Sequence, residues 1–220
     1  MQTGQLSVGE LADAVLGAMP DLEPAGEHLA IALHRLLAEG SPVGTAQLAA
    51  ATGLSEPDVA GLLGEWPGVF TDGQGRVAGF WGQAIGELTP THRLEAGGRA
   101  VYGWCAFDTL FLPGRLGQVA QVTSTCPVTG EEIRLTVGPG EITGVSHPGA
   151  VVSFLLPGGP FSADVVQSFC HFIYFFASRQ AGLQWTAEHP GTFLLTLGEA
   201  FELAVVGNRR MFPNALAGGR

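Results

Sequence analysis

The sequence predicts an α+β protein in which a helical N-terminal region precedes a region built around β-sheet. Apolar residues recur at helical spacing up to residue 65, whereas short alternating segments separated by Gly and Pro turns dominate after it. The 220 residues are 46% hydrophobic and 14% charged, a composition typical of a globular chain. We therefore expect a winged-helix-like region with three helices in residues 1–85. Residues 86–220 should form a mixed or antiparallel sheet with flanking helices.

Helix-start and helix-stop signals define the N-terminal region. Ser7 with Glu10, and Ser55 with Asp58, have the spacing of capping boxes, in which side chains satisfy free N–H groups at the start of a helix. Gly40 follows the strongest apolar stripe and supplies a stop signal. The predicted helices cover residues 7–18, 25–39, 45–51 and 55–65.

A hairpin is expected next, around Asp72-Gly73-Gln74-Gly75, which gives the element order of a winged helix-turn-helix. The helix that would enter a DNA groove carries Glu56, Asp58 and Glu65 and no basic residue. Residues 1–98 contain twelve acidic residues and three Arg, which gives a net charge of −9. Because phosphate contacts require cationic side chains, we expect this region to bind no nucleic acid and to act as a structural cap or lid.

From residue 86 onwards the sequence predicts mainly strands, with a changeover marked by Pro90 and Gly97-Gly98. Segments that alternate or are rich in β-branched residues are separated by turn residues. The predicted strands, including the two of the hairpin, are 69–71, 76–81, 86–88, 93–95, 100–104, 118–125, 131–137, 142–146, 150–156 and 172–177. Helices are expected at 164–169 and 197–210.

A thiol and a carboxylic acid, Cys105 and Asp108, lie three residues apart in an otherwise apolar segment. If a helix starts here, both side chains lie on one face of it. A second thiol, Cys170, follows 65 residues later in another apolar segment. Acids are seldom buried unless they are paired or functional. The pattern therefore suggests two thiols and one acid converging on a soft electrophile.

Other interpretations of these residues remain open at this point. A buried cysteine is most often an inert apolar residue, and Asp108 could instead cap a helix. Two thiols could form a redox pair, or Cys105, Cys126, Cys170 and His171 could bind structural zinc. The sequence lacks the close Cys-x-x-Cys pairs typical of both kinds of site. A non-enzymatic soft-metal binder or thiol sensor is a further alternative, but it has no need of an acid beside its thiol.

Three separated segments resemble, in the same order, motifs of the organomercurial lyase (alkylmercury lyase) family. They are YGWCAFDTL at 102–110, TSTCPVTG at 123–130 and DVVQSFCH at 164–171. The resemblance covers roughly residues 25–205. It implies that Cys105 and Cys170 bind mercury, with Asp108 in the same mercury site as the acid that protonates the departing carbon. It also implies a structural role for Cys126.

The resemblance implies cleavage of the carbon–mercury bond of alkyl- and arylmercury compounds to a hydrocarbon and Hg(II), for mercury detoxification and without an organic cofactor. The chemistry agrees, since thiolates are the softest protein ligands and the carbon must receive a proton. Tyr102, Trp104 and Phe169 are candidates to line an apolar pocket. The implied partners are an organomercurial substrate, small thiols that take up Hg(II), and mercuric reductase as a further Hg(II) acceptor.

The remaining features favour a cytoplasmic bacterial protein. No apolar run reaches the length needed to span a membrane, so we expect no membrane partner. The chain begins Met1-Gln2-Thr3-Gly4, without the basic and apolar segments of a secretory signal. Its three cysteines, an odd number, fit a reducing compartment. All ten basic residues are Arg, which together with 33 Gly and 14 Pro suggests a bacterial genome of high GC content.

Overall fold

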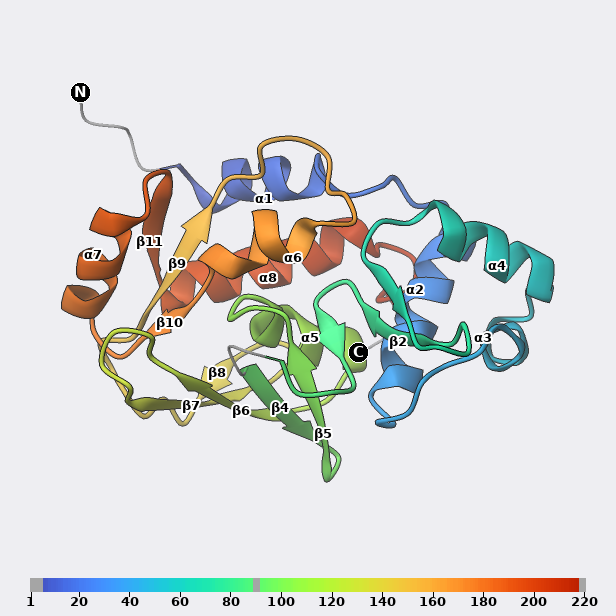
Figure 1. The fold of residues 1–220 in the computed structure, drawn as a ribbon, viewed down its shortest axis with the longest axis horizontal. Coiled ribbons are helices and arrows are strands. Elements are labelled where there is room, and N and C mark those ends of the chain that lie inside the picture. The colour runs from blue at the N-terminus through green and yellow to red at the C-terminus, as the bar shows by residue number, and fades with distance from the viewer. Residues whose placement is uncertain (1–5, 89–91, 218–220) are drawn as a thin grey trace.

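A helical unit closed by a β-hairpin forms one end of the molecule (Figure 1). The computed structural model describes residues 6–88 and 92–217, so Pro90 lies outside the described residues. Helices α2, α3 and α4, followed by the antiparallel pair β1–β2, have the predicted winged-helix order. The elements are α1 (Val8–Leu16), α2 (Pro24–Leu37), α3 (Thr45–Thr52), α4 (Glu56–Glu65), β1 (Val69–Thr71) and β2 (Val77–Phe80).

Local side-chain chemistry sets the boundaries of these helices. The Ser7 hydroxyl accepts the N–H of Glu10, and the Glu10 carboxylate accepts the N–H of Ser7, so α1 begins with a complete capping box. Ser55 accepts the N–H of Asp58 in the same way at the start of α4. Gly53 ends α3 at a φ of 76°, a conformation that glycine adopts without strain.

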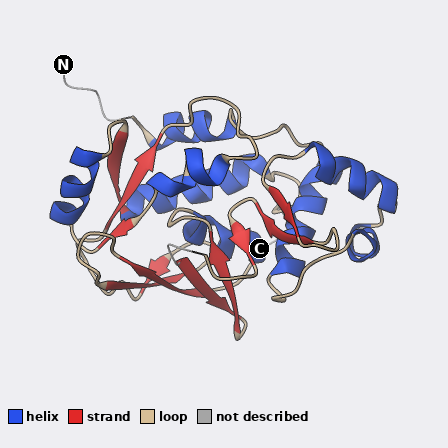
Figure 2. Cartoon of the chain, in the orientation of Figure 1, coloured by secondary structure: helices blue, strands red, loops and turns tan. Residues whose placement is uncertain are grey.

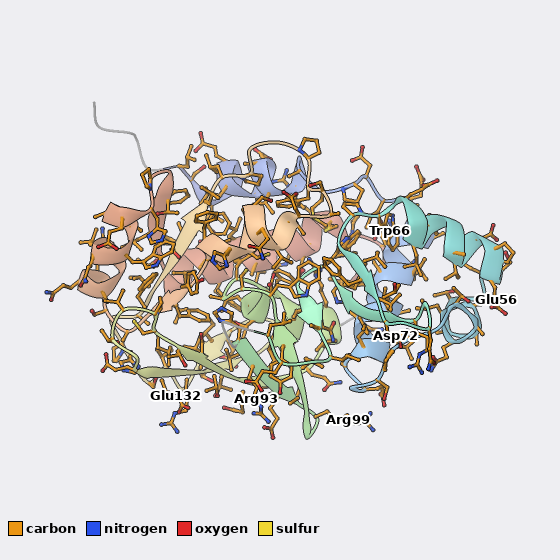
Figure 3. All side chains as sticks on the ribbon, in the orientation of Figure 1. Glu56, Trp66, Asp72, Arg93, Arg99 and Glu132 are labelled. Carbon is orange, nitrogen blue, oxygen red and sulfur yellow. The ribbon has the colours of Figure 1, made fainter. Side chains whose placement is uncertain are left out.

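The surface of α4 is acidic. Glu56, Asp58 and Glu65 are all exposed on it, and Figure 3 shows Glu56 at the far end of this unit, with Asp72 on the hairpin nearby. Helix α4 contains no basic residue. A groove of DNA would therefore meet negative charge where binding requires positive charge.

An eight-stranded antiparallel sheet connects the helical unit to the rest of the molecule, in the order β1-β2-β3-β5-β4-β6-β7-β8. Strand β3 (Gln83–Ala84) pairs with β2 on one side and β5 on the other. The strand expected at 86–88 is therefore wrong, because these pairings place the extended segment at 83–84 instead. The remaining strands are β4 (His92–Ala96), β5 (Arg99–Gly103), β6 (Ala120–Thr125), β7 (Glu132–Val137) and β8 (Ile142–Thr143).

A smaller antiparallel sheet, ordered β10-β9-β11, lies at the opposite end of the molecule from the hairpin (Figure 2). The strand expected at 172–177 is reduced to Phe175–Phe176, because Cys170–Phe172 form a 3₁₀ turn, η1. Helix α7 and strand β11 were not predicted from the sequence. The elements of this part are α5 (Asp108–Leu116), β9 (Val151–Leu155), α6 (Val165–Ser168), β10 (Phe175–Phe176), α7 (Arg179–Glu188), β11 (Thr192–Thr196) and α8 (Leu197–Met211).

Helix α5 lies between the large sheet and α8, and α1 packs on α8 (Figure 1). Two hydrophobic clusters result. Each contains residues that are distant in the sequence from the elements that form most of it. Leu11 and Ala12 of α1 belong to the larger cluster, around α5 and the sheets. Met211 and Phe212 belong to the smaller one, around α2, α3 and the hairpin. The tail that follows is held by the buried carboxylate of Glu27, which accepts the N–H groups of residues 214 and 215.

Each hydrophobic cluster contains residues from both sides of residue 85. The domain boundary expected at residue 85 therefore stays a prediction. In the part of the chain that the structure describes, every helix is too short or too polar to cross a bilayer.

Candidate active site

Cys105 and Asp108 occupy the junction between β5 and α5. The Cys105 N–H donates to Asp108 Oδ2 over 2.6 Å, so the carboxyl group folds back over the segment that precedes its helix. The N-cap position of α5 belongs to Phe107, and Asp108 caps no helix N–H. The capping role considered for Asp108 is therefore wrong, and the buried carboxyl group is free to take part in chemistry.

Cys170 lies beside this pair. One ligand atom from each of Cys105, Asp108 and Cys170 lies within 4.8 Å of the other two, and all three residues are buried. Both thiols are free. A backbone hydrogen bond of 3.1 Å from the N–H of Ala106 to the carbonyl of Ile173 ties the Cys105 segment to the Cys170 segment. A single soft ion can therefore contact both sulfur atoms.

Burial determines the protonation of the three groups. It raises the pKa of Asp108 to about 7, although hydrogen bonds from Cys105 and the Arg115 charge oppose the rise. Burial also raises the pKa of Cys105 well above the ordinary thiol value, and the hydrogen bond with Cys170 raises it further. That same hydrogen bond lowers the pKa of Cys170, but burial and the Asp108 charge raise it overall. Because the pKa of Asp108 is raised to about 7, an acid proton is available near neutral pH.

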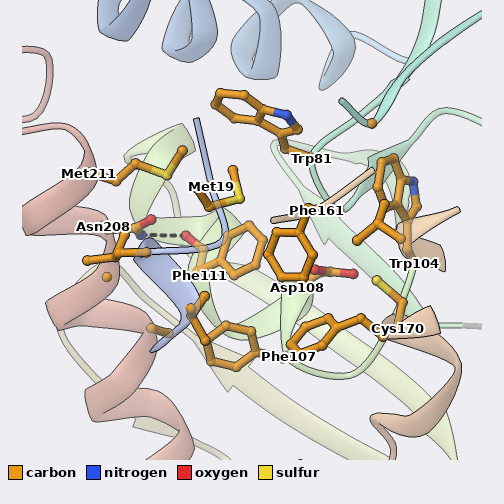
Figure 4. Close-up of a pocket in the computed structure, with 18 of the residues that line it drawn as sticks. Met19, Trp81, Trp104, Phe107, Asp108, Phe111, Phe161, Cys170, Asn208 and Met211 are labelled. Atoms are coloured by element: carbon orange, nitrogen blue, oxygen red, sulfur yellow. Dashed lines mark hydrogen bonds between the residues drawn. The ribbon is translucent and has the colours of Figure 1, made fainter. Parts of the chain in front are cut away.

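An apolar cavity of about 90 Å³ opens onto Cys170 and Asp108 (Figure 4). Trp104 and Phe169 line it, as the sequence suggested. Tyr102 does not line it; its half-buried side chain lies on the opposite face of β5 from the buried Val101. Large apolar side chains supply much of the remaining wall: Met19, Trp81, Phe107, Phe111, Phe161 and Met211.

Comparison with known proteins agrees with this geometry. A family model described as alkylmercury lyase matches residues 87–206, and one described as the helix-turn-helix domain of alkylmercury lyase matches residues 8–81. An alkylmercury lyase of Staphylococcus epidermidis is 40% identical over 172 residues, covering 78% of this chain and 77% of the relative. One of Pseudomonas putida is 41% identical over 175 residues, covering 80% of each.

The chain belongs to the alkylmercury lyase family. A solved structure described as the mercury-bound form of MerB2 has the same fold, with a TM-score of 0.71, 22% identity, and coverage of 94% of this chain and 100% of that one. The resemblance seen in the three sequence motifs is thereby confirmed, together with the α+β fold and the assignment of the chain as an alkylmercury lyase.

This alkylmercury lyase also relies on a residue that the sequence did not single out. Gly82 has a φ of 91°, and a Cβ added to it would overlap the Asp108 carboxylate, at 2.6 Å from its Cγ, and would lie 2.9 Å from Cζ of Phe111. Only glycine permits this approach. The turn at Gly82, which follows β2, therefore lies in direct contact with the acid.

The third cysteine of this alkylmercury lyase lies apart from the site. Cys126 is buried in the turn between β6 and β7, where its N–H donates to the carbonyl of Glu131 over 2.9 Å. Among the described residues, the group able to hold a metal ion contains neither Cys126 nor His171. The four-ligand zinc site considered from the sequence is therefore not formed.

Proposed function

We propose that this chain cleaves the carbon–mercury bond of alkyl- and arylmercury compounds by protonolysis at Cys105, Asp108 and Cys170. The observation that carries the proposal is the convergence of two free thiols and a proton-bearing acid, within 4.8 Å, beside an apolar cavity. Thiolates provide the affinity for mercury. The acid provides the proton that cleavage requires in addition to binding.

The proposed reaction begins with capture of the organomercury cation. Each thiol releases its proton to water, or to the ligand that leaves mercury, as its sulfur bonds to mercury. Electron density from two thiolates weakens the carbon–mercury bond. Asp108 then transfers its proton to the carbon, which keeps the electron pair of the broken bond. The products are the hydrocarbon, Hg(II) held by the two thiolates, and an Asp108 carboxylate.

The apolar cavity supports this assignment in two ways. Its aromatic wall, which includes Trp104, Phe107 and Phe169, suits a methyl or phenyl group but offers little to a polar substrate. The same wall keeps the carboxyl group of Asp108 dry, which raises its pKa and so retains the proton to be transferred.

Further proposals follow from this chemistry. Small thiols, and mercuric reductase as a later acceptor, would remove the bound Hg(II) by ligand exchange in the reducing cytoplasm. The reaction would need no organic cofactor. The winged-helix region, residues 1–85, would bind no nucleic acid. It would cap a catalytic region made by residues 86–220. Cys126 would be structural.

A non-enzymatic soft-metal binder or thiol sensor was the alternative suggested by the cysteines alone. The deciding experiment is incubation of the protein with phenylmercury and excess small thiol, followed by measurement of benzene. We expect repeated turnover by the wild type and loss of both capture and cleavage in Cys105→Ala. Tight capture of phenylmercury by the folded wild type without benzene would identify a binder and end the lyase proposal.

A further inference from the structure

Arg115 is buried in the core beside the site. The other Arg residues that the structure describes are not buried. It lies two helical turns after Asp108 on α5 and therefore on the same face of that helix. Both residues line the same cavity. Burying a guanidinium group is costly unless its charge and its N–H groups are satisfied.

The hydrogen-bond partners of Arg115 are neutral. Its Nε donates to Oδ1 of Asn208 over 2.9 Å, and a terminal nitrogen lies 2.9 Å from Nε2 of His34. Its guanidinium group stacks over the ring of Phe111 at 4.0 Å and lies 4.9 Å from that of Phe212. These contacts engage Nε and one terminal nitrogen of Arg115, and none of the ion pairs among the described residues involves its charge.

The winged-helix region fixes this arrangement. Gln83 donates to the His34 carbonyl over 3.2 Å, so its Oε1 faces Nδ1 of His34 at 2.8 Å and accepts a hydrogen bond from the Nδ1–H group. Nε2 of His34 is consequently the bare nitrogen and accepts the hydrogen bond from Arg115. Burial, and then the Arg115 charge, lower the pKa of His34 well below its usual value, which keeps the ring neutral.

Phe111 separates the cation from the acid. Its ring stacks on Arg115 on one side, and its Cζ reaches the turn at Gly82 that also meets the Asp108 carboxyl group. Charges that interact through an apolar side chain are screened much less than charges in water. The Arg115 charge can therefore act on Asp108 without forming an ion pair that would remove its proton.

We propose that Arg115 is a positioning residue that stabilises the carboxylate left on Asp108 when its proton passes to the departing carbon. His34 and Gln83 of the winged-helix region hold Arg115 in place for this role. The inference rests on the proposed lyase function. In that reaction the bond from the Asp108 oxygen to hydrogen breaks, a carbon–hydrogen bond forms, and a negative charge appears in a buried site that contains one fixed cation.

The test compares Arg115→Gln, which keeps an N–H donor but loses the charge, with Arg115→Lys, which keeps the charge. Each variant is loaded with one equivalent of phenylmercury. Capture is measured by intact-protein mass, and benzene release is measured in a single turnover. We expect Arg115→Gln to capture phenylmercury like the wild type but to release benzene more slowly by on the order of tenfold, the effect of removing one buried charge at roughly 10 Å. Arg115→Lys should recover most of the rate.

Arg134, which is exposed and paired with Glu132 on β7, provides the matched control, and Arg134→Gln should behave as the wild type. Benzene release at the wild-type rate by folded Arg115→Gln, or equal slowing in Arg115→Lys, would overturn the inference. If Arg115→Gln does not fold, Arg115→Met takes its place. Unfolding of both neutral variants while Arg115→Lys folds would assign Arg115 a structural role and also overturn it. Failure of the proposed function is distinguishable, because the wild type itself would then release no benzene.

Discussion

Replacing Asp108 with asparagine removes the acid but keeps its size and its ability to accept the Cys105 N–H. We expect Asp108→Asn to bind organomercury through its two thiols and to release hydrocarbon about 10²–10⁴-fold more slowly, the usual contribution of a general acid. The same substitution should also change the stability of the protein in a pH-dependent manner, which provides a second and independent measurement.

The sign and size of the stability effect follow from the pKa of Asp108. It is about 7 in the folded protein, against about 3.9 in an unfolded chain. Below about pH 4 the group is protonated in both the folded and the unfolded state, so it does not change the free energy of unfolding. Between about pH 4 and 7 the unfolded chain releases the proton while the folded protein keeps it, so stability falls as pH rises. Above pH 7 the accumulated penalty is about 4 kcal/mol.

Asp108→Asn cannot ionise and should escape this penalty. Its free energy of unfolding relative to the wild type should therefore increase between pH 4 and pH 8 by up to about 4 kcal/mol. Urea unfolding at both pH values measures the change, and any constant effect of the amide cancels in the comparison. A pH-independent difference between the two proteins would show that Asp108 is ionised in the folded state. Wild-type benzene release by the folded variant would refute its role as the proton donor.

Three further predictions concern other parts of the molecule. Gly82→Ala should displace the Asp108 carboxyl group, slow cleavage by roughly tenfold or more and cost about 1–3 kcal/mol of stability. Gly86→Ala, whose added Cβ meets open space, should have none of these effects, and equal behaviour of the two variants would contradict the close approach at Gly82. Cys126→Ser should lower the unfolding temperature, by the equivalent of about 1–3 kcal/mol for a buried hydroxyl, but leave turnover per folded molecule unchanged; a folded, inactive variant would place Cys126 in the site. Fluorescence anisotropy with duplex DNA should show no salt-sensitive binding at submicromolar protein, and a clear binding curve there would restore a DNA-binding role.

Local sequence was sufficient for one half of the site. The three-residue spacing of Cys105 and Asp108 predicted two neighbouring side chains on one helix face. The structure brings them together by a hydrogen bond of 2.6 Å, but the helix begins only at Asp108, so they do not share a helix face. The capping boxes at Ser7 and Ser55 likewise predicted helix starts, because these hydrogen bonds form within four residues of sequence.

The other half of the site depends on contacts that no local pattern encodes. Cys170 reaches the pair through the 3₁₀ turn and the backbone bond to Ile173, where the apolar run had suggested a strand. Arg115 looks like an ordinary basic residue near a helix C-terminus, and its function depends on His34, 81 residues away. Gly82 is one of 33 glycines, and its role emerges only when α5 packs against it. The aromatic character of Tyr102 did not reveal that its side chain lies outside the cavity.

The N-terminal helix α1 packs in the larger hydrophobic cluster, whereas residues near the C-terminus pack in the smaller one, and this has a consequence for how such proteins evolve. Met211 and Phe212 fill the core of the helix-turn-helix unit, and Glu27 of that unit anchors the residues after them. A recombination event that swapped only the N-terminal segment would therefore leave a hole in the incoming unit and an unsatisfied carboxylate. Such a unit cannot be shuffled between genes as a free-standing module. Substitutions in α2 should instead be inherited together with compensating changes near the C-terminus.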